Sequence, residues 1–279
     1  MLLKTNTDIP IDSIKINFDT EGLWILNIAL AIIMFGVALS IKIEDFKLLI
    51  KKPKILLVGV FSQFFLLPAL TFVAILIIKP HPSFALGMMM IAACPGGNIS
   101  NFFSKMAKGN SALSVSLTAF ATVICLLMTP LNLQFYSGLY EPTNEIIKTV
   151  QLDPIELFKL VLLILGIPIV LGMSLNHYFE EISKKIEVLL KPFSIVVFLA
   201  LIVIAFYDNI DVFLKYIHLV AGLVIFHNIG AYFIGFYTAK TFGLEKKDRK
   251  TICMETGIQN GGLGLLLIFQ FFDGLGGMA

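Results

Sequence analysis

The chain has 279 residues, of which 57% are hydrophobic and 14% are charged, and its formal net charge is +2. Soluble domains carry about a quarter charged residues. This composition, with a mean hydropathy of +0.89, therefore predicts a membrane protein. The small charge, spread among apolar stretches, argues against a nucleic-acid-binding surface. The three cysteines are widely spaced and form no CxxC pair, so they indicate neither a disulfide framework nor a zinc site.

The predicted elements begin after a polar N-terminus of residues 1–21, which lacks the apolar segment of a cleaved signal peptide. Residues 22–279 then form one membrane domain. A helix needs about 20 apolar residues to cross a bilayer, and eight stretches meet this length. In the first half, 22–136, they are 22–41, 55–78, 82–107 and 110–136, and in the second half, 157–272, they are 157–177, 188–207, 216–239 and 251–272.

The basic residues predict the orientation of these spans. If the spans alternate in direction, fifteen of the 21 lysine and arginine residues fall on one side of the membrane. The positive-inside rule places that side in the cytoplasm. The N-terminus is then extracytoplasmic.

Two glycine-rich interruptions lie inside apolar spans, CPGGN at 94–98 and GIQNGG at 257–262. The interrupted spans are the third and the eighth, which cross the membrane in opposite directions, and the stretches 22–97 and 188–262 share the same order of elements. This order predicts an inverted-topology repeat. Broken helices at corresponding positions of two such halves are typical of the substrate and ion site of secondary transporters.

Polar side chains gather at both interruptions. A broken helix exposes carbonyl groups at one end and N–H groups at the other, and these attract cations and anions respectively. Neutral oxygen ligands suit a hard cation. The side chains near the first break are Asn98, Ser100, Asn101 and, one helix later, Ser114 and Thr118, which share a helix face. Those near the second are Glu255, Gln259 and Asn260, with Gln63 available from the second span.

Each of these side chains also has a structural interpretation. Serine and threonine in membrane helices often form hydrogen bonds to backbone groups or to neighbouring helices. Ser114 and Thr118 by themselves therefore indicate a structural role rather than a ligand role. Glu255 favours function because an ionisable group within a membrane span is energetically costly. Its proximity to Lys250 leaves open the alternative that it extends toward the interface.

Several segments, in order and at the expected separations, resemble the bile acid:sodium symporter family. They are CPGGNISNFFSKMAKGNSALSVSLTAFATVICLLMTP at 94–130, ETGIQNGGLG at 255–264, IMFGVALSIKIEDF at 33–46 and FHNIGAYFIGF at 226–236. The resemblance covers nearly the whole chain from about residue 22. It implies an all-α polytopic transporter of inverted repeats, with a core domain in which two discontinuous helices cross and a panel domain that moves against it.

The resemblance also implies roles for individual residues. It assigns Ser100, Asn101, Ser114, Thr118 and Glu255 to a first sodium site. It assigns Gln63, Glu255, Gln259 and the backbone carbonyls of Thr256 and Ile258 to a second. Two sodium ions are therefore expected. Asn98 and Asn260 are expected near the anionic group of the substrate.

The chain departs from the family pattern at both ends. Like nine-helix members, it has no helix before the one that starts near Gly22, and it stops after the eighth span, where members continue with one more helix. We expect a form that lacks this last helix, which lines the substrate cavity in the family.

The expected function is a sodium-coupled symporter that imports an organic anion, bile-acid-like or a small carboxylate, across the plasma (inner) membrane. We expect no enzymatic activity, since neither a Walker A nor an HExxH motif occurs, and no obligatory protein partner. Two alternatives stay open. One is a proton-driven efflux permease for an arsenite-like substrate, with Cys94 as a soft ligand. The other is a membrane receptor or assembly subunit that does not transport.

Overall fold

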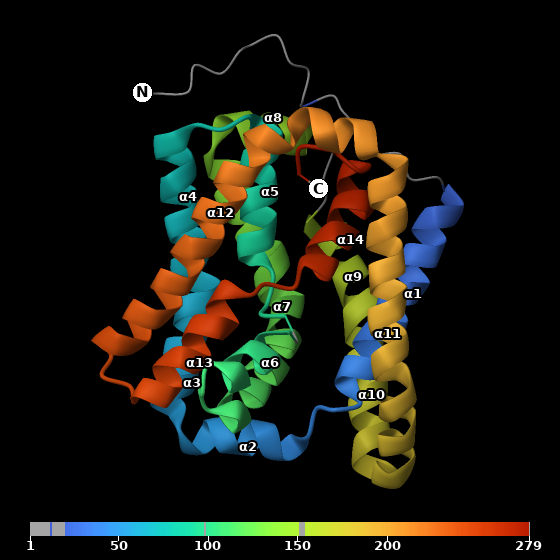
Figure 1. Cartoon of the computed structure of the whole chain (residues 1–279), viewed down its shortest axis with the longest axis vertical. Helices are drawn as coiled ribbons and strands as arrows, with labels where there is room; N and C mark the ends of the chain where they lie inside the picture. The colour runs from blue at the N-terminus through green and yellow to red at the C-terminus, as the bar shows by residue number, and fades with distance from the viewer. Residues whose placement is uncertain (1–11, 13–19, 98, 151–153, 279) are drawn as a thin grey trace.

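The computed structural model describes residue 12 and residues 20–97, 99–150 and 154–278 (Figure 1). Within these ranges the elements are helical, and the only strand-like contact is an isolated backbone bridge. The protein is an all-α polytopic membrane protein, as the composition predicts. Asn98 and most of the polar N-terminus lie outside the described residues.

The first half contains α1 (Thr20–Ala38), α2 (Ile43–Lys51), α3 (Pro53–Phe61), η2 (Ser62–Leu66), α4 (Leu67–Ile78), α5 (Pro82–Ala93), α6 (Ile99–Met106) and α7 (Ser111–Leu139). The second half contains α9 (Pro154–Val161), η3 (Leu162–Gly166), α10 (Ile167–Tyr178), α11 (Glu180–Asp208), α12 (Ile210–Thr241), α13 (Lys246–Gly257) and α14 (Gly261–Phe272). The short helix α8 (Glu141–Val150) connects the halves.

A helix, or a helix with an interruption, lies at every stretch predicted to span. By length and composition, three helical stretches of the described chain are long and apolar enough to cross a membrane: Pro53–Ile78, Ser111–Leu139 and Ile210–Thr241. Helix α11 is longer than the predicted span 188–207 and contains Pro192. The short helices α2 and α8 were not predicted, because both are polar and too short to resemble a span.

Two helices widen into a π-helical turn immediately before a proline. In η2 the amide of Leu67 donates to the carbonyl of Ser62 and Pro68 follows, while in η3 the amide of Ile167 donates to the carbonyl of Leu162 and Pro168 follows. Proline lacks an N–H group, and its ring collides with the carbonyl four residues earlier. The wider turn separates that carbonyl from the ring, so the same local sequence order produces the same distortion twice.

The helices form two packed groups. Helices α1, α10 and α11 pack on one another, while α12 packs along α13, which also contacts α6 and α7 (Figure 1). A hydrophobic cluster joins the groups, with members such as Met34 of α1, Met89 of α5, Ile169 of α10 and Phe269 of α14. This division corresponds to the panel and core expected from the family resemblance.

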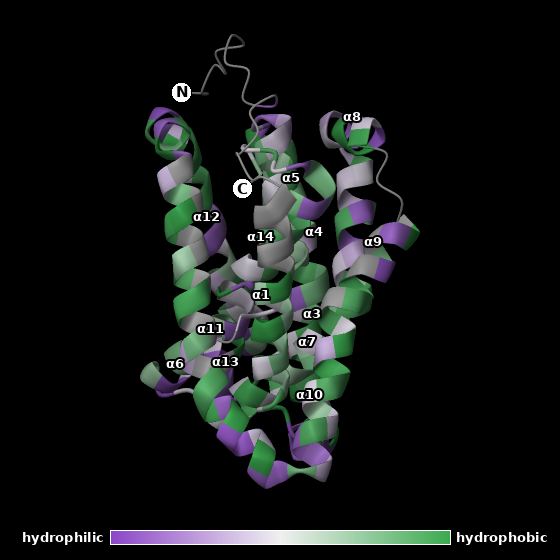
Figure 2. Ribbon diagram, turned by 90° about the vertical axis from the view of Figure 1, so that its right-hand side faces the viewer, coloured by the Kyte–Doolittle hydropathy of each residue, from purple (hydrophilic) through white to green (hydrophobic). Residues whose placement is uncertain are grey.

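Hydrophobic residues prevail along the middle of the helices, and hydrophilic residues gather toward both ends of the bundle (Figure 2). The lysine-rich connections around α2, between α6 and α7, and between α12 and α13 lie at the end opposite α8 (Figure 1). The structure therefore brings these three lysine-rich connections to the same end of the bundle.

Candidate ion and substrate site at the crossing helices

The two interrupted helices cross at their breaks. The amide of Gly97 donates to the carbonyl of Ile258 at 2.8 Å, and the amide of Asn260 donates to the carbonyl of Pro95 at 2.8 Å. Gly96 and Gln259 form an antiparallel bridge between these bonds. The backbone groups freed by each break are thus paired with the other break, which satisfies the requirement that polar backbone groups within a membrane find partners.

Glycine is required at this crossing because the two backbones approach closely. A Cβ atom on Gly96 would lie 2.9 Å from the carbonyl oxygen of Glu255 and 3.0 Å from its Oε2 atom. One on Gly97 would lie 3.0 Å from the carbonyl oxygen of Gln259. Any larger residue would force the crossing apart.

The carboxylate of Glu255 is the centre of the first cluster. It is 6% exposed and accepts hydrogen bonds from Ser100 Oγ at 2.6 Å and Ser114 Oγ at 2.5 Å, both to Oε1. Thr118 Oγ1 lies 2.8 Å from Oε2 and donates to it. The three hydroxyls come from α6 and α7, while the carboxylate comes from α13. Each hydroxyl keeps lone pairs for a cation after donating its hydrogen.

Asn101 extends this first cluster. Its Oδ1 atom lies 3.3 Å from Thr118 Oγ1, within hydrogen-bonding distance. All five residues that the resemblance assigns to a first sodium site are therefore connected through Glu255 or Thr118. The atoms through which these residues would coordinate a cation are all oxygens.

The second cluster surrounds Gln63 of η2. Its Nε2 group donates to Gln259 Oε1 at 2.7 Å and to the carbonyl of Cys94 at 2.9 Å. Gln259 Nε2 in turn donates to the carbonyl of Thr256 at 2.6 Å. The carbonyl of Ile258 accepts from Gly97, which leaves it one lone pair. The residues expected in a second sodium site are thus also brought together.

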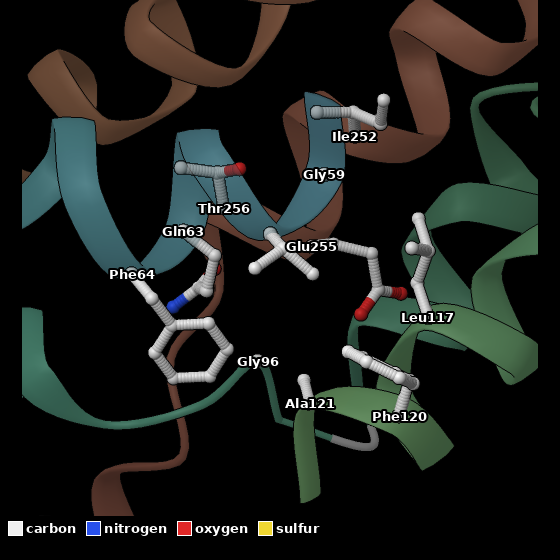
Figure 3. Close-up of a pocket in the computed structure, with 11 residues that line it drawn as sticks. Gly59, Gln63, Phe64, Gly96, Leu117, Phe120, Ala121, Ile252, Glu255 and Thr256 are labelled. Atoms are coloured by element: carbon white, nitrogen blue, oxygen red, sulfur yellow. The ribbon is translucent and has the colours of Figure 1, made fainter. Parts of the chain in front are cut away.

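Gln63 carries an unsatisfied oxygen. Its Oε1 atom is buried and has no hydrogen-bond donor within the described part of the chain. A buried acceptor without a partner costs about 1–3 kcal/mol. A cavity of about 20 Å³ is lined by the polar residues Gln63, Glu255 and Thr256 and otherwise by glycine and apolar residues (Figure 3). That volume accommodates one water molecule or one small ion.

The donor set fits an alkali cation. Among the described residues no group of three or more His, Cys, Asp or Glu side chains could hold a metal ion. One carboxylate with hydroxyl, amide and carbonyl oxygens instead provides the hard ligands and low charge that a monovalent cation prefers.

The structure describes one of the two asparagines that are expected near the substrate, Asn260. Asn98 lies outside the described residues. Asn260 caps α14, since its Oδ1 atom accepts from the amide of Leu263 at 3.1 Å. This bond uses only the Oδ1 atom of Asn260. A role of Asn260 in substrate binding stays a prediction.

Sequence reasoning missed three supporting side chains. Ser62 Oγ lies 3.0 Å from Thr256 Oγ1, Thr129 Oγ1 donates to the carbonyl of Ala93 at 2.7 Å, and Asn132 Nδ2 donates to the carbonyl of Phe64 at 2.8 Å. The proline at 68 and the break after Ala93 signal that carbonyls there need donors. No sequence feature shows which side chain supplies them.

The chain is similar to known transporters along most of its length. Residues 27–216 match the model of the Sodium Bile acid symporter family. The chain is 31% identical to an uncharacterized sodium-dependent transporter of Bacillus subtilis, YocS, over 93% of this chain and 79% of that protein. It is 28% identical to the probable chloroplastic sodium/metabolite cotransporter BASS1 of Arabidopsis thaliana, over 88% and 59%. It is 29% identical to the human ileal sodium/bile acid cotransporter, over 85% and 66%. The chain therefore belongs to the sodium bile acid symporter family.

Proposed function

We propose that this protein is a sodium-coupled symporter that imports a small organic anion across the plasma membrane, with its lysine-rich end in the cytoplasm. The observation that carries the proposal is the buried Glu255 carboxylate of one interrupted helix, which is surrounded by hydroxyl oxygens from α6 of the other interrupted helix and from α7. The names of these relatives, all sodium-dependent transporters or sodium cotransporters, support the choice of ion.

Charge provides a physical reason for coupling. Without cations the crossing carries the single negative charge of Glu255, which repels an anionic substrate. With two sodium ions the same region has a net charge of +1. An anion then binds next to the breaks, where helix N-termini also attract negative charge. Sodium and substrate therefore favour each other's binding, and reciprocity of this kind is what symport requires.

The packing suggests how access could alternate. The group α1, α10 and α11 would move as a panel against the core that contains the crossing. Its contacts with the core are largely apolar, as the cluster around Met34, Met89 and Phe269 illustrates. Such contacts lack directional bonds, so they permit rigid-body sliding at modest cost.

The test is thermal unfolding of the purified protein against sodium chloride, with potassium chloride replacing sodium to hold ionic strength constant. Binding to the native state stabilises it by RT ln(1 + [L]/Kd), about 2.7 kcal/mol at 100 times Kd. We expect a sodium-specific rise in Tm that Glu255→Gln abolishes. The matched control is Asp248→Asn, because Asp248 is a similarly buried carboxylate on the same helix, bonded to Asn110 away from the crossing.

Equal Tm values in sodium and potassium would reject the proposal. Where sodium stabilises the protein, uptake of taurocholate and of pyruvate into proteoliposomes under an inward sodium gradient tests the substrate class. Sodium stabilisation with no uptake of either would favour a receptor, whereas uptake driven by a pH gradient alone would favour a proton-coupled permease.

A further inference from the structure

The π turn before Pro68 leaves a carbonyl group in need of a donor. In an α-helix the amide of residue 68 would donate to the carbonyl of Phe64, but proline has no N–H group. Phe64 is buried, with 1% of its surface exposed. Within a membrane a freed carbonyl must find another partner.

Asn132 of α7 provides that partner. Its Nδ2 group donates to the carbonyl of Phe64 at 2.8 Å, and its side chain is 9% exposed. The bond therefore replaces the one that Pro68 removes. It also attaches α7 to the π turn at the residue next to Gln63.

Gln63 depends on the geometry of this turn. Its side chain extends from the turn toward the crossing, where the cavity lies between it and Glu255 (Figure 3). A small rotation of the turn would withdraw Gln63 Nε2 from Cys94 and Gln259, to which it now donates. The orientation of the unsatisfied Oε1 atom would change at the same time.

Helix α7 consequently contacts the first cluster directly and the second through the π turn. Near its start, Ser114 and Thr118 donate to Glu255. Farther along, Asn132 holds the turn that presents Gln63. One helix thus connects the two groups of oxygens that would hold the two ions.

We infer that Asn132 is a positioning residue for the second sodium site, acting through the Phe64 carbonyl to orient Gln63. The inference rests on the proposed sodium-coupled function. Mutation of a group that orients a metal ligand commonly changes the affinity for the ion strongly, although the group itself does not touch the ion.

The experiment fits the rise of Tm with sodium concentration to RT ln(1 + [L]/Kd) and takes the fitted Kd as the sodium midpoint. The variant is Asn132→Leu, which keeps the side chain's size and removes the donor. We expect this midpoint to rise roughly 3- to 10-fold, the effect of losing one hydrogen bond. The matched control is Thr143→Val, which removes a buried donor to the carbonyls of Ser137 and Tyr140 far from the crossing. Its midpoint should equal that of the unmodified protein. Asn132→Ala replaces the leucine variant if the latter does not fold.

A double-mutant cycle separates positioning from general loss of structure. If Asn132 acts through Gln63, then adding Asn132→Leu to Gln63→Leu should leave the midpoint of Gln63→Leu unchanged. An equal shift in both backgrounds, or no shift in the single variant, would overturn the inference. Absence of sodium stabilisation in the unmodified protein would instead reject the proposed function, so the two failures are distinguishable.

Discussion

Gly96 and Gln259 face each other in an antiparallel bridge at the point where the two interrupted helices cross. They are far apart in the sequence, and each belongs to the break of one helix. Gly96 of this bridge lines one small cavity together with Glu255 and Gln63, which comes from η2 (Figure 3).

Gly96→Ala should disrupt this crossing. The added Cβ atom would lie 2.9 Å from the carbonyl oxygen of Glu255, a backbone atom that cannot easily move. Overpacking of this kind typically costs about 1–3 kcal/mol. We expect a lower Tm in potassium and a weaker sodium response.

The control for Gly96→Ala is Gly138→Ala in α7, where a Cβ atom would meet nothing within 4 Å. Alanine is favoured over glycine in helices by about 0.8–1 kcal/mol, so this variant should be as stable as the original protein or slightly more stable. If Gly96→Ala is as stable as Gly138→Ala, the close approach of the two backbones at the crossing does not limit stability.

Thr118→Val should weaken sodium binding. The change removes the hydroxyl that donates to Glu255 Oε2 and contacts Asn101. We expect the sodium midpoint in the thermal titration to rise roughly 10-fold, equivalent to about 1.4 kcal/mol. Thr122→Val is the comparison, since Thr122 is equally buried one turn away and donates only to the carbonyl of Thr118. Equal midpoints in the two variants would argue against a ligand role for Thr118.

Asn110→Ala should lower stability without changing sodium affinity. Asn110 caps α7 by accepting from the amide of Leu113, and its Nδ2 group donates to the buried Asp248 at 2.8 Å. Loss of a cap costs about 1 kcal/mol, and the carboxylate loses a partner as well. Urea unfolding in potassium should show the decrease, while the sodium midpoint stays unchanged. A changed midpoint would mean that this end of α13 communicates with the crossing.

Glu180 should contribute a small, pH-dependent stabilisation at the lysine-rich end. Its carboxylate lies 3.0 Å from Lys42 Nζ and 3.2 Å from Lys184 Nζ, and hydrogen bonds from these lysines lower the pKa of Glu180. A lowered pKa stabilises the folded state above the ordinary pKa near 4.5, and the effect disappears as pH falls through the folded value. Glu180→Gln should therefore lower Tm slightly at pH 7.

This difference should shrink in concentrated potassium chloride, because exposed ion pairs are screened. It should vanish once the pH is below the lowered pKa of folded Glu180, where the carboxyl is protonated in both states. The neighbouring exposed variant Glu181→Gln is the reference. A larger or salt-independent effect would show that the contact does more than pair two surface charges.

The sequence by itself determined the class of the protein and the position of its breaks. Apolar stretches of bilayer length specify helices, and the glycine-rich stretches CPGGN at 94–98 and GIQNGG at 257–262 mark where two of those helices are interrupted. The types of oxygen-bearing side chain near the breaks were also readable, because few polar groups occur in apolar spans.

The tertiary structure decided which of these groups meet. Ser100 and Glu255 are separated by more than half the chain, and only the crossing places Ser100 Oγ at 2.6 Å from Glu255 Oε1. The same is true of Asn132. Pro68 indicates in the sequence that a carbonyl has lost its hydrogen-bond donor, but any polar side chain with an N–H or O–H group could supply a new donor. Packing of α7 against the π turn selects Asn132, because hydrogen bonds depend on distances that local propensity and composition do not contain.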